Sequence, residues 1–93
     1  MQVVYARCAG LDVHKKTVSA CVSVCEVEGG KQQQMRVFGT FTSDLLALAD
    51  WLRVERVELV AMEATSDYWK PVFYLLEAEG FECWLLNAKH VKN

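Results

Sequence analysis

Strict alternation of apolar and small polar residues over residues 18–25 constrains the fold of this chain more than any other feature. One set is apolar and suits a core: Val18, Ala20, Val22 and Val24. The intervening set is smaller or more polar: Ser19, Cys21, Ser23 and Cys25. Successive side chains of a strand point to opposite faces, so a period of two predicts a β-strand with one buried face.

The neighbouring segments extend this strand into an antiparallel meander of three strands. Residues 6–13 are apolar apart from Arg7 and Asp12, which predicts a central strand. Gly29 and Gly30 predict a hairpin turn, because glycine tolerates positive φ. Residues 35–41 are then expected to form the returning strand, with one face made of Met35, Val37, Gly39 and Phe41.

The spacing becomes helical after residue 41. The side chains available to cap the helix N-terminus are those of Thr42, Ser43 and Asp44. The apolar stripe of this first helix would be Leu45, Leu48, Ala49 and Leu52. Residues 57–62 are almost continuously apolar, which predicts a strand buried on both faces.

A second helix is expected to begin near Ser66 or Asp67 and to end at Gly80, because glycine is common just after a helix. Pro71 must then lie in its first turn, where no backbone N–H is needed. The buried residues of this helix would be Trp69, Val72, Phe73 and Leu76. Residues 81–86 predict a fifth strand, and residues 87–93 form a polar tail.

The resulting order, β-β-β-α-β-α-β, is that of the α/β ribonuclease-H-like fold with a mixed sheet. Right-handed crossovers would place the fourth strand parallel to the first and beside it. In that fold a further helix comes after the fifth strand. We therefore expect residues 1–93 to form the N-terminal part of such a domain, truncated before its final helix.

Composition limits the classes of protein that fit. With 93 residues, 53% of them hydrophobic and 24% charged, the chain can bury a core as one small domain or part of one. Its net charge of -2 disfavours a stand-alone nucleic-acid binder, which usually presents a basic surface. No apolar run approaches the roughly 20 residues that span a bilayer. Residues 1–7 lack a signal-peptide pattern, so we expect a cytoplasmic protein without membrane association.

The four cysteines contain no C-x-x-C pair, and their spacing disfavours a zinc site: Cys8, Cys21, Cys25 and Cys83. In a reducing compartment they would remain thiols. We expect them to be buried as small hydrophobic residues.

Two carboxylates lie at the ends of the predicted parallel strands. Asp12 lies at the carboxyl end of the first strand and Glu63 at that of the fourth. Ligand sites in open α/β sheets lie at the carboxyl ends of strands. Two close acids repel each other unless a divalent cation neutralises them. An acid at a strand end can equally be a turn former or the ion-pair partner of a nearby lysine.

Two stretches resemble the N-terminal signatures of a bacterial transposase family: residues 9–16, AGLDVHKK, and residues 62–71, MEATSDYWKP. Residues 87–93, NAKHVKN, resemble the segment after the fifth strand in the same family. The family is the DEDD transposases of insertion sequences, which includes the Piv-type site-specific DNA invertases. The similarity runs in order over nearly the whole chain. Ser66 stands where the family often has glycine, which indicates a turn that favours glycine.

The resemblance implies a nuclease domain similar to that of RuvC-like Holliday-junction resolvases, in which an Asp-Glu-Asp-Asp tetrad holds Mg²⁺. Asp12 matches the first acid and Glu63 the second, as catalytic residues and metal ligands. The third and fourth acids would lie beyond residue 93. Full-length members carry out DNA transposition by DNA cleavage and joining, and some are guided by a structured RNA. We expect this chain alone to be inactive and to form homo-oligomers.

Residues near the two acids are expected to contact nucleic acid: His14, Lys15, Lys16, Tyr68 and Lys70. A lysine can contact phosphate as a point charge, although a solvated turn explains Lys15 and Lys16 equally well. Oxygen ligands suit magnesium better than His14 does. Thr65 is expected to support Glu63 through a hydrogen bond.

Two other functions fit parts of the pattern. Actin-like sugar and acetate kinases share much of the element order and also begin with a strand ending in Gly-x-Asp, as Gly10 to Asp12 does. Their phosphate loop needs a glycine soon after that aspartate, and residues 13–16 contain none. A non-catalytic module that docks RNA or another subunit is the second alternative, because an uncovered sheet face would drive association.

Overall fold

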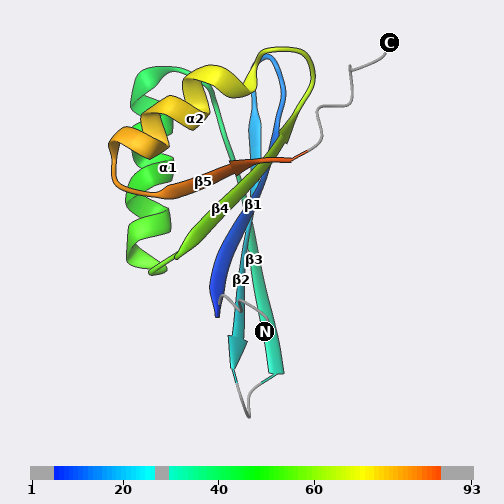
Figure 1. Cartoon of the computed structure of the whole chain (residues 1–93), viewed down its shortest axis with the longest axis vertical. Helices are drawn as coiled ribbons and strands as arrows, with labels where there is room; N and C mark the ends of the chain where they lie inside the picture. Colours follow the sequence, from blue (N-terminus) through cyan, green and yellow to red (C-terminus); the bar gives the residue numbers. More distant parts are fainter. Residues whose placement is uncertain (1–5, 27–29, 87–93) are drawn as a thin grey trace.

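The computed structural model describes residues 6–26 and 30–86, which form a five-stranded sheet with two helices on one of its faces (Figure 1). The elements occur in the predicted order: β1 Arg7–Val13, β2 Val18–Glu26, β3 Gly30–Phe38, α1 Thr42–Val54, β4 Leu59–Ala64, α2 Trp69–Ala78 and β5 Glu82–Leu85. The strand order across the sheet is β3-β2-β1-β4-β5. The mixed ribonuclease-H-like sheet expected from the sequence is therefore present.

Strand β1 lies at the centre of the sheet, as predicted. It pairs antiparallel with β2, from Arg7 opposite Val24 to Val13 opposite Val18. On its other side it pairs parallel with β4. The parallel pairing is what brings the carboxyl ends of β1 and β4 to the same edge of the sheet.

The core lies between the sheet and the two helices. The alternating apolar residues of β2 all face it, and Val18, Ala20 and Val22 are completely buried. The predicted stripe of α1 meets them there, since Leu45, Leu48, Ala49 and Leu52 are all buried. The opposite side of the sheet carries no helix or strand from the described residues, and we call it the open face.

The returning strand differs from its predicted bounds. Strand β3 begins at Gly30, whose φ is +74°, and ends at Phe38. Its first residues pair with β2 through the backbone while their side chains remain exposed, so no apolar alternation marks them. Gly39 and Phe41 lie outside the strand, and only Met35 and Val37 share a strand face as expected.

The first helix also begins differently from the prediction. None of the three expected side chains occupies the N-cap position, which is held by Phe41. Asp44 instead reaches back from the first turn, and its carboxylate accepts a hydrogen bond of 3.1 Å from the Phe41 N–H. This bond satisfies a donor that precedes the helix.

The second helix begins at Trp69, later than the predicted Ser66 or Asp67. Ser66 adopts a left-handed backbone with φ of 54°, so it cannot belong to a right-handed helix. Pro71 is the third residue of α2 and lies in its first turn, as required. Gly80 comes after the helix with φ of +98°, which confirms its predicted role.

Strand β4, at Leu59–Ala64, begins and ends two residues later than the predicted 57–62, and β5 is shorter than predicted because it spans only Glu82–Leu85. Residues 87–93, the predicted tail, lie outside the described residues, as does Gly29. No helix in the part of the chain that the structure describes is long and apolar enough to cross a membrane.

The expectation that the cysteines are buried is wrong. Cys8, Cys21 and Cys83 are half-buried and Cys25 is exposed, all as free thiols. The cysteines of β2 occupy the alternate positions that point away from the core, and Cys8 lies opposite one of these positions, Ser23. Cys8, Cys21 and Cys25 therefore belong to the open face of the sheet, whereas Cys83 packs against the core.

Candidate metal and nucleic-acid site

Asp12 and Glu63 lie side by side at the carboxyl edge of the sheet. Each is the penultimate residue of its strand, and they are register partners in the parallel pairing of β1 with β4. Their neighbours Val13 and Ala64 are buried in the core, so the strand alternation directs both carboxylates to the open face. The two acids predicted to meet are thus brought together by the central pairing of the fold.

The carboxylates face a shallow hollow of about 510 Å³ on the open face. Ser19 continues the row of the two acids, because it is the partner of Asp12 in the pairing of β1 with β2. The residues lining the hollow are Gly10, Leu11, Asp12, Ser19, Cys21, Met35, Ala61, Glu63 and Leu86. The acids therefore lie in a row of polar side chains, and the rest of the hollow is lined mainly by apolar residues.

His14 contacts the first acid directly. Its Nε2 atom lies 3.1 Å from Oδ2 of Asp12, and both side chains are more than half exposed. The contact orients the Asp12 carboxylate from the β1–β2 turn. The Glu63 carboxylate, half-buried, forms no hydrogen bond or ion pair with any other described residue.

The carboxylates of Asp12 and Glu63 supply some of the ligands that a hard divalent cation needs. Two neighbouring carboxylates supply the oxygen ligands that Mg²⁺ prefers. Within residues 6–26 and 30–86, no cluster of three or more acidic, histidine or cysteine side chains is arranged to hold a metal ion. Asp12 and Glu63 therefore fit as part of a metal site that needs further ligands or water.

The lysines predicted to bind nucleic acid lie in the turn after β1. The His14 N–H donates to the Thr17 carbonyl at 2.8 Å, which closes this turn. The Thr40 hydroxyl donates to the Lys15 carbonyl at 3.3 Å and ties the turn to the start of α1. Lys15 and Lys16 are both exposed in this turn, at the end of the sheet where β1 ends.

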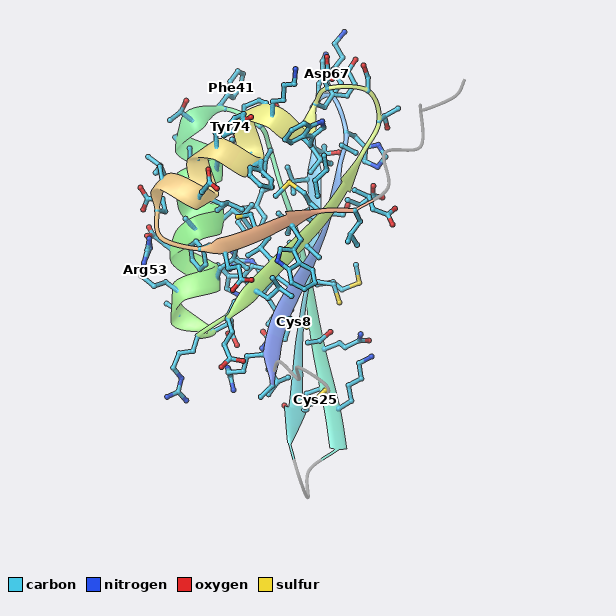
Figure 2. The ribbon with its side chains drawn as sticks, viewed as in Figure 1. Cys8, Cys25, Phe41, Arg53, Asp67 and Tyr74 are labelled. Atoms are coloured by element: carbon cyan, nitrogen blue, oxygen red, sulfur yellow. The ribbon has the colours of Figure 1, made fainter. Side chains whose placement is uncertain are left out.

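The β4–α2 turn lies at the same end of the molecule, where Figure 2 labels Asp67. Lys70 pairs with Asp67 at 3.8 Å, and Tyr68 is 38% exposed. Trp69 packs edge-on against Phe73 with ring centroids 5.5 Å apart. Both are only partly buried against the core, so the predicted burial of α2 holds fully for Val72 and Leu76 alone.

Thr65 connects the two turns through its backbone. Its N–H donates to the Val13 carbonyl at 3.4 Å. Among the described residues, no hydrogen bond joins its side chain to Glu63. Support of Glu63 by Thr65 remains a prediction.

Three features of this region were not found from the sequence. Ser19 and Met35 line the hollow because of the strand register, which one sequence does not reveal. A second hollow, beside the β1–β2 turn, is lined partly by Phe41, which the sequence pattern places in a strand. The signal for Ser19 was its place in the alternation, on the side away from the core.

Comparison with solved structures supports the fold. The chain is similar to Thermus thermophilus RuvC, with a TM-score of 0.61, 16% identity, and coverage of 86% of this chain and 63% of that one. It is also similar to an Aquifex aeolicus member of the Ppx/GppA family, with a TM-score of 0.55, 13% identity, and coverage of 89% and 35%. The chain thus spans less than two thirds of the RuvC structure and about a third of the Ppx/GppA structure. No curated protein matches it significantly.

Comparison with sequence families identifies the family of this chain, whereas the structural similarities show only its fold. The family model of the IS110-type DEDD transposases, described as "Transposase", matches residues 9–93. The match includes both acidic residues and nearly the whole chain. This protein chain belongs to the DEDD transposase family.

Proposed function

We propose that Asp12 and Glu63 provide two of the acidic ligands of a magnesium-dependent DNA-cleaving centre used in DNA transposition. The observation that carries the proposal is their register partnership at the carboxyl ends of β1 and β4. Family membership supplies the reaction class, and the RuvC-like fold is compatible with it.

The chemistry of the pair supports this role. Two carboxylates on adjacent strands repel each other and favour a cation between them. When bound, divalent ions supply Lewis acidity at a phosphodiester and make a water more acidic. Asp12 and Glu63 would hold them, and the contact from His14 would keep the Asp12 carboxylate oriented.

The surrounding residues fit the binding of a DNA strand. Lys15 and Lys16 are exposed in the turn after Asp12, and they would contact phosphates. We propose that His14, Tyr68 and Lys70 contribute further contacts and that Thr65 supports Glu63. Action on bacterial DNA would place the protein in the cytoplasm.

The proposal concerns the complete transposase. Two carboxylates are half of the tetrad that the family resemblance implies, so we expect this chain alone to bind Mg²⁺ weakly and not to cleave DNA. Further ligands and use of a guide RNA would belong to the complete protein, whereas homo-oligomer formation is expected of this chain as well.

The test is a Mg²⁺-dependent strand-cleavage assay with full-length protein. Asp12→Asn and Glu63→Gln should each abolish cleavage while leaving the protein folded. Asp67→Asn is the matched control, because it neutralises an exposed acid at the same end of the molecule and should retain activity. Unchanged cleavage by both Asp12→Asn and Glu63→Gln would show the nuclease proposal to be wrong.

A non-catalytic docking module is a second candidate, favoured by the apolar open face. Met35, Val37 and Leu86 are 68%, 65% and 45% exposed on it. Exposed apolar patches promote association, so we expect the 93-residue chain to dimerise through this face. A strictly monomeric chain by light scattering at high concentration would contradict this. The kinase alternative is disfavoured by the family match and by the absence of glycine from residues 13–16.

A further inference from the structure

We propose that a second hollow, beside the β1–β2 turn, holds one unpaired guanine base of the DNA strand, stacked on Phe41. This base hollow has a volume of about 380 Å³ and is lined by Lys16, Gly39, Thr40, Phe41 and Asp44. The inference rests on the proposed function, because it assumes that a DNA strand crosses the turn that carries Lys15 and Lys16.

Phe41 has the properties of a stacking platform. It is 80% exposed, more than any other large hydrophobic residue of the described chain. Its φ of -67° and ψ of 156° place it before the helix. Its backbone is anchored by the hydrogen bond to Asp44, and its ring stacks on no aromatic residue within the described ranges. An anchored and unstacked ring offers a face to a nucleobase.

The polar groups of the base hollow match the edge of guanine. Asp44 accepts a single hydrogen bond through Oδ2, so its carboxylate retains acceptor capacity. Lys16 supplies a donor with a positive charge. Guanine presents two adjacent N–H donors and a neighbouring carbonyl acceptor on its pairing edge. A carboxylate beside an ammonium group complements that pattern, whereas thymine places a carbonyl on each side of its single donor.

Charge also decides which part of a nucleotide enters. The Asp44 carboxylate would repel a phosphate inside the base hollow. Lys15 lies in the same turn and is exposed outside it, where it can contact the phosphate. Figure 2 shows Phe41 and Asp67 toward the same end of the molecule, the end where β4 leads into α2. The proposal requires a strand that passes the two acids on the open face to cross residues 14–17 before its base reaches Phe41.

The test is binding of short single-stranded oligonucleotides to the 93-residue chain at low salt, followed by amide chemical shifts. The probes are a thymine pentanucleotide and the same oligonucleotide with one central guanine. We expect the guanine probe to bind at least fivefold more tightly and to shift the amides of residues 39–44. Phe41→Ala and Phe41→Leu should remove this preference, and Phe41→Tyr should keep it.

Val54→Ala is the matched control, because Val54 is an exposed apolar residue at the other end of α1 and should bind as the unmodified chain does. Equal binding of the two probes, no detectable binding at millimolar probe, or unchanged binding by Phe41→Leu would each overturn the inference. Failure here would leave the cleavage test of Asp12 and Glu63 unaffected, so the two proposals can be separated.

Discussion

Asp12 and Glu63 are direct partners in the parallel pairing of the two central strands, and both carboxylates lie on the face of the sheet that the helices leave open. The arrangement places like charges on neighbouring positions of the parallel pairing between β1 and β4. Such a pair destabilises the sheet unless a cation or a proton compensates it. The site therefore links the stability of the domain to its proposed metal.

Neutralising one acid should stabilise the chain in the absence of divalent cations. We expect Glu63→Gln to raise the free energy of unfolding by about 0.2–1 kcal/mol in EDTA, because it removes the repulsion from Asp12. Added Mg²⁺ should stabilise the unmodified chain and have little effect on the variant. Urea unfolding with and without Mg²⁺ measures both. Asp67→Asn, the control, should retain the response to Mg²⁺, and an equal response in Glu63→Gln would argue against a shared site.

Glycine at position 66 should stabilise the chain, because the backbone there adopts a conformation that glycine favours. The φ of Ser66, 54°, is left-handed, so Ser66→Gly is expected to raise the free energy of unfolding by about 0.5–1 kcal/mol. Ser43→Gly provides the contrast, because Ser43 is helical in α1 and glycine there should destabilise the chain. Thermal unfolding of both variants tests the backbone of the β4–α2 turn. Destabilisation by Ser66→Gly would mean that this turn is not left-handed.

The Cys83 thiol should react slowly in the folded chain. Burial, with the nearby negative charges of Glu77 and Glu82, raises its pKa from 9.0 to about 11. Because the folded-state pKa is the higher one, the associated stability is fully present below pH 9 and is lost as the pH rises toward 11. Alkylation by iodoacetamide at about pH 8, below the pKa of an ordinary thiol, should be much slower at Cys83 in buffer than in urea. Peptide mass spectrometry measures both rates, and equal rates would contradict the burial of this thiol.

Much of the fold was predictable because its strands and helices bury one face each. The alternation of residues 18–25 and the stripe from Leu45 to Leu52 both mark surfaces that contact the core. The same reasoning failed for residues 31–34, which are Lys-Gln-Gln-Gln. These residues are held in β3 by backbone pairing with β2 and have no buried side chains to signal it.

The site was predictable only in part. The positions of Asp12 and Glu63 at strand ends indicated where they would meet, whereas their roles came from the family resemblance. The contact of His14 with Asp12 depends on the shape of a tight turn, and the hollow around Ser19 and Met35 depends on register. Phe41 was missed because an apolar residue next to a strand pattern is easily assigned to the strand.

The central claim, that Asp12 and Glu63 form one divalent-cation site, is tested most directly by paramagnetic broadening with Mn²⁺. In ¹⁵N-labelled chain, substoichiometric Mn²⁺ should broaden the amides around both acids, including Gly10 and Ala61, which line the same hollow. Asp12→Asn and Glu63→Gln should each remove the broadening on both strands, and Asp67→Asn should not. Broadening that persists around Glu63 in the Asp12→Asn variant, or that centres elsewhere in the chain, would contradict a shared site.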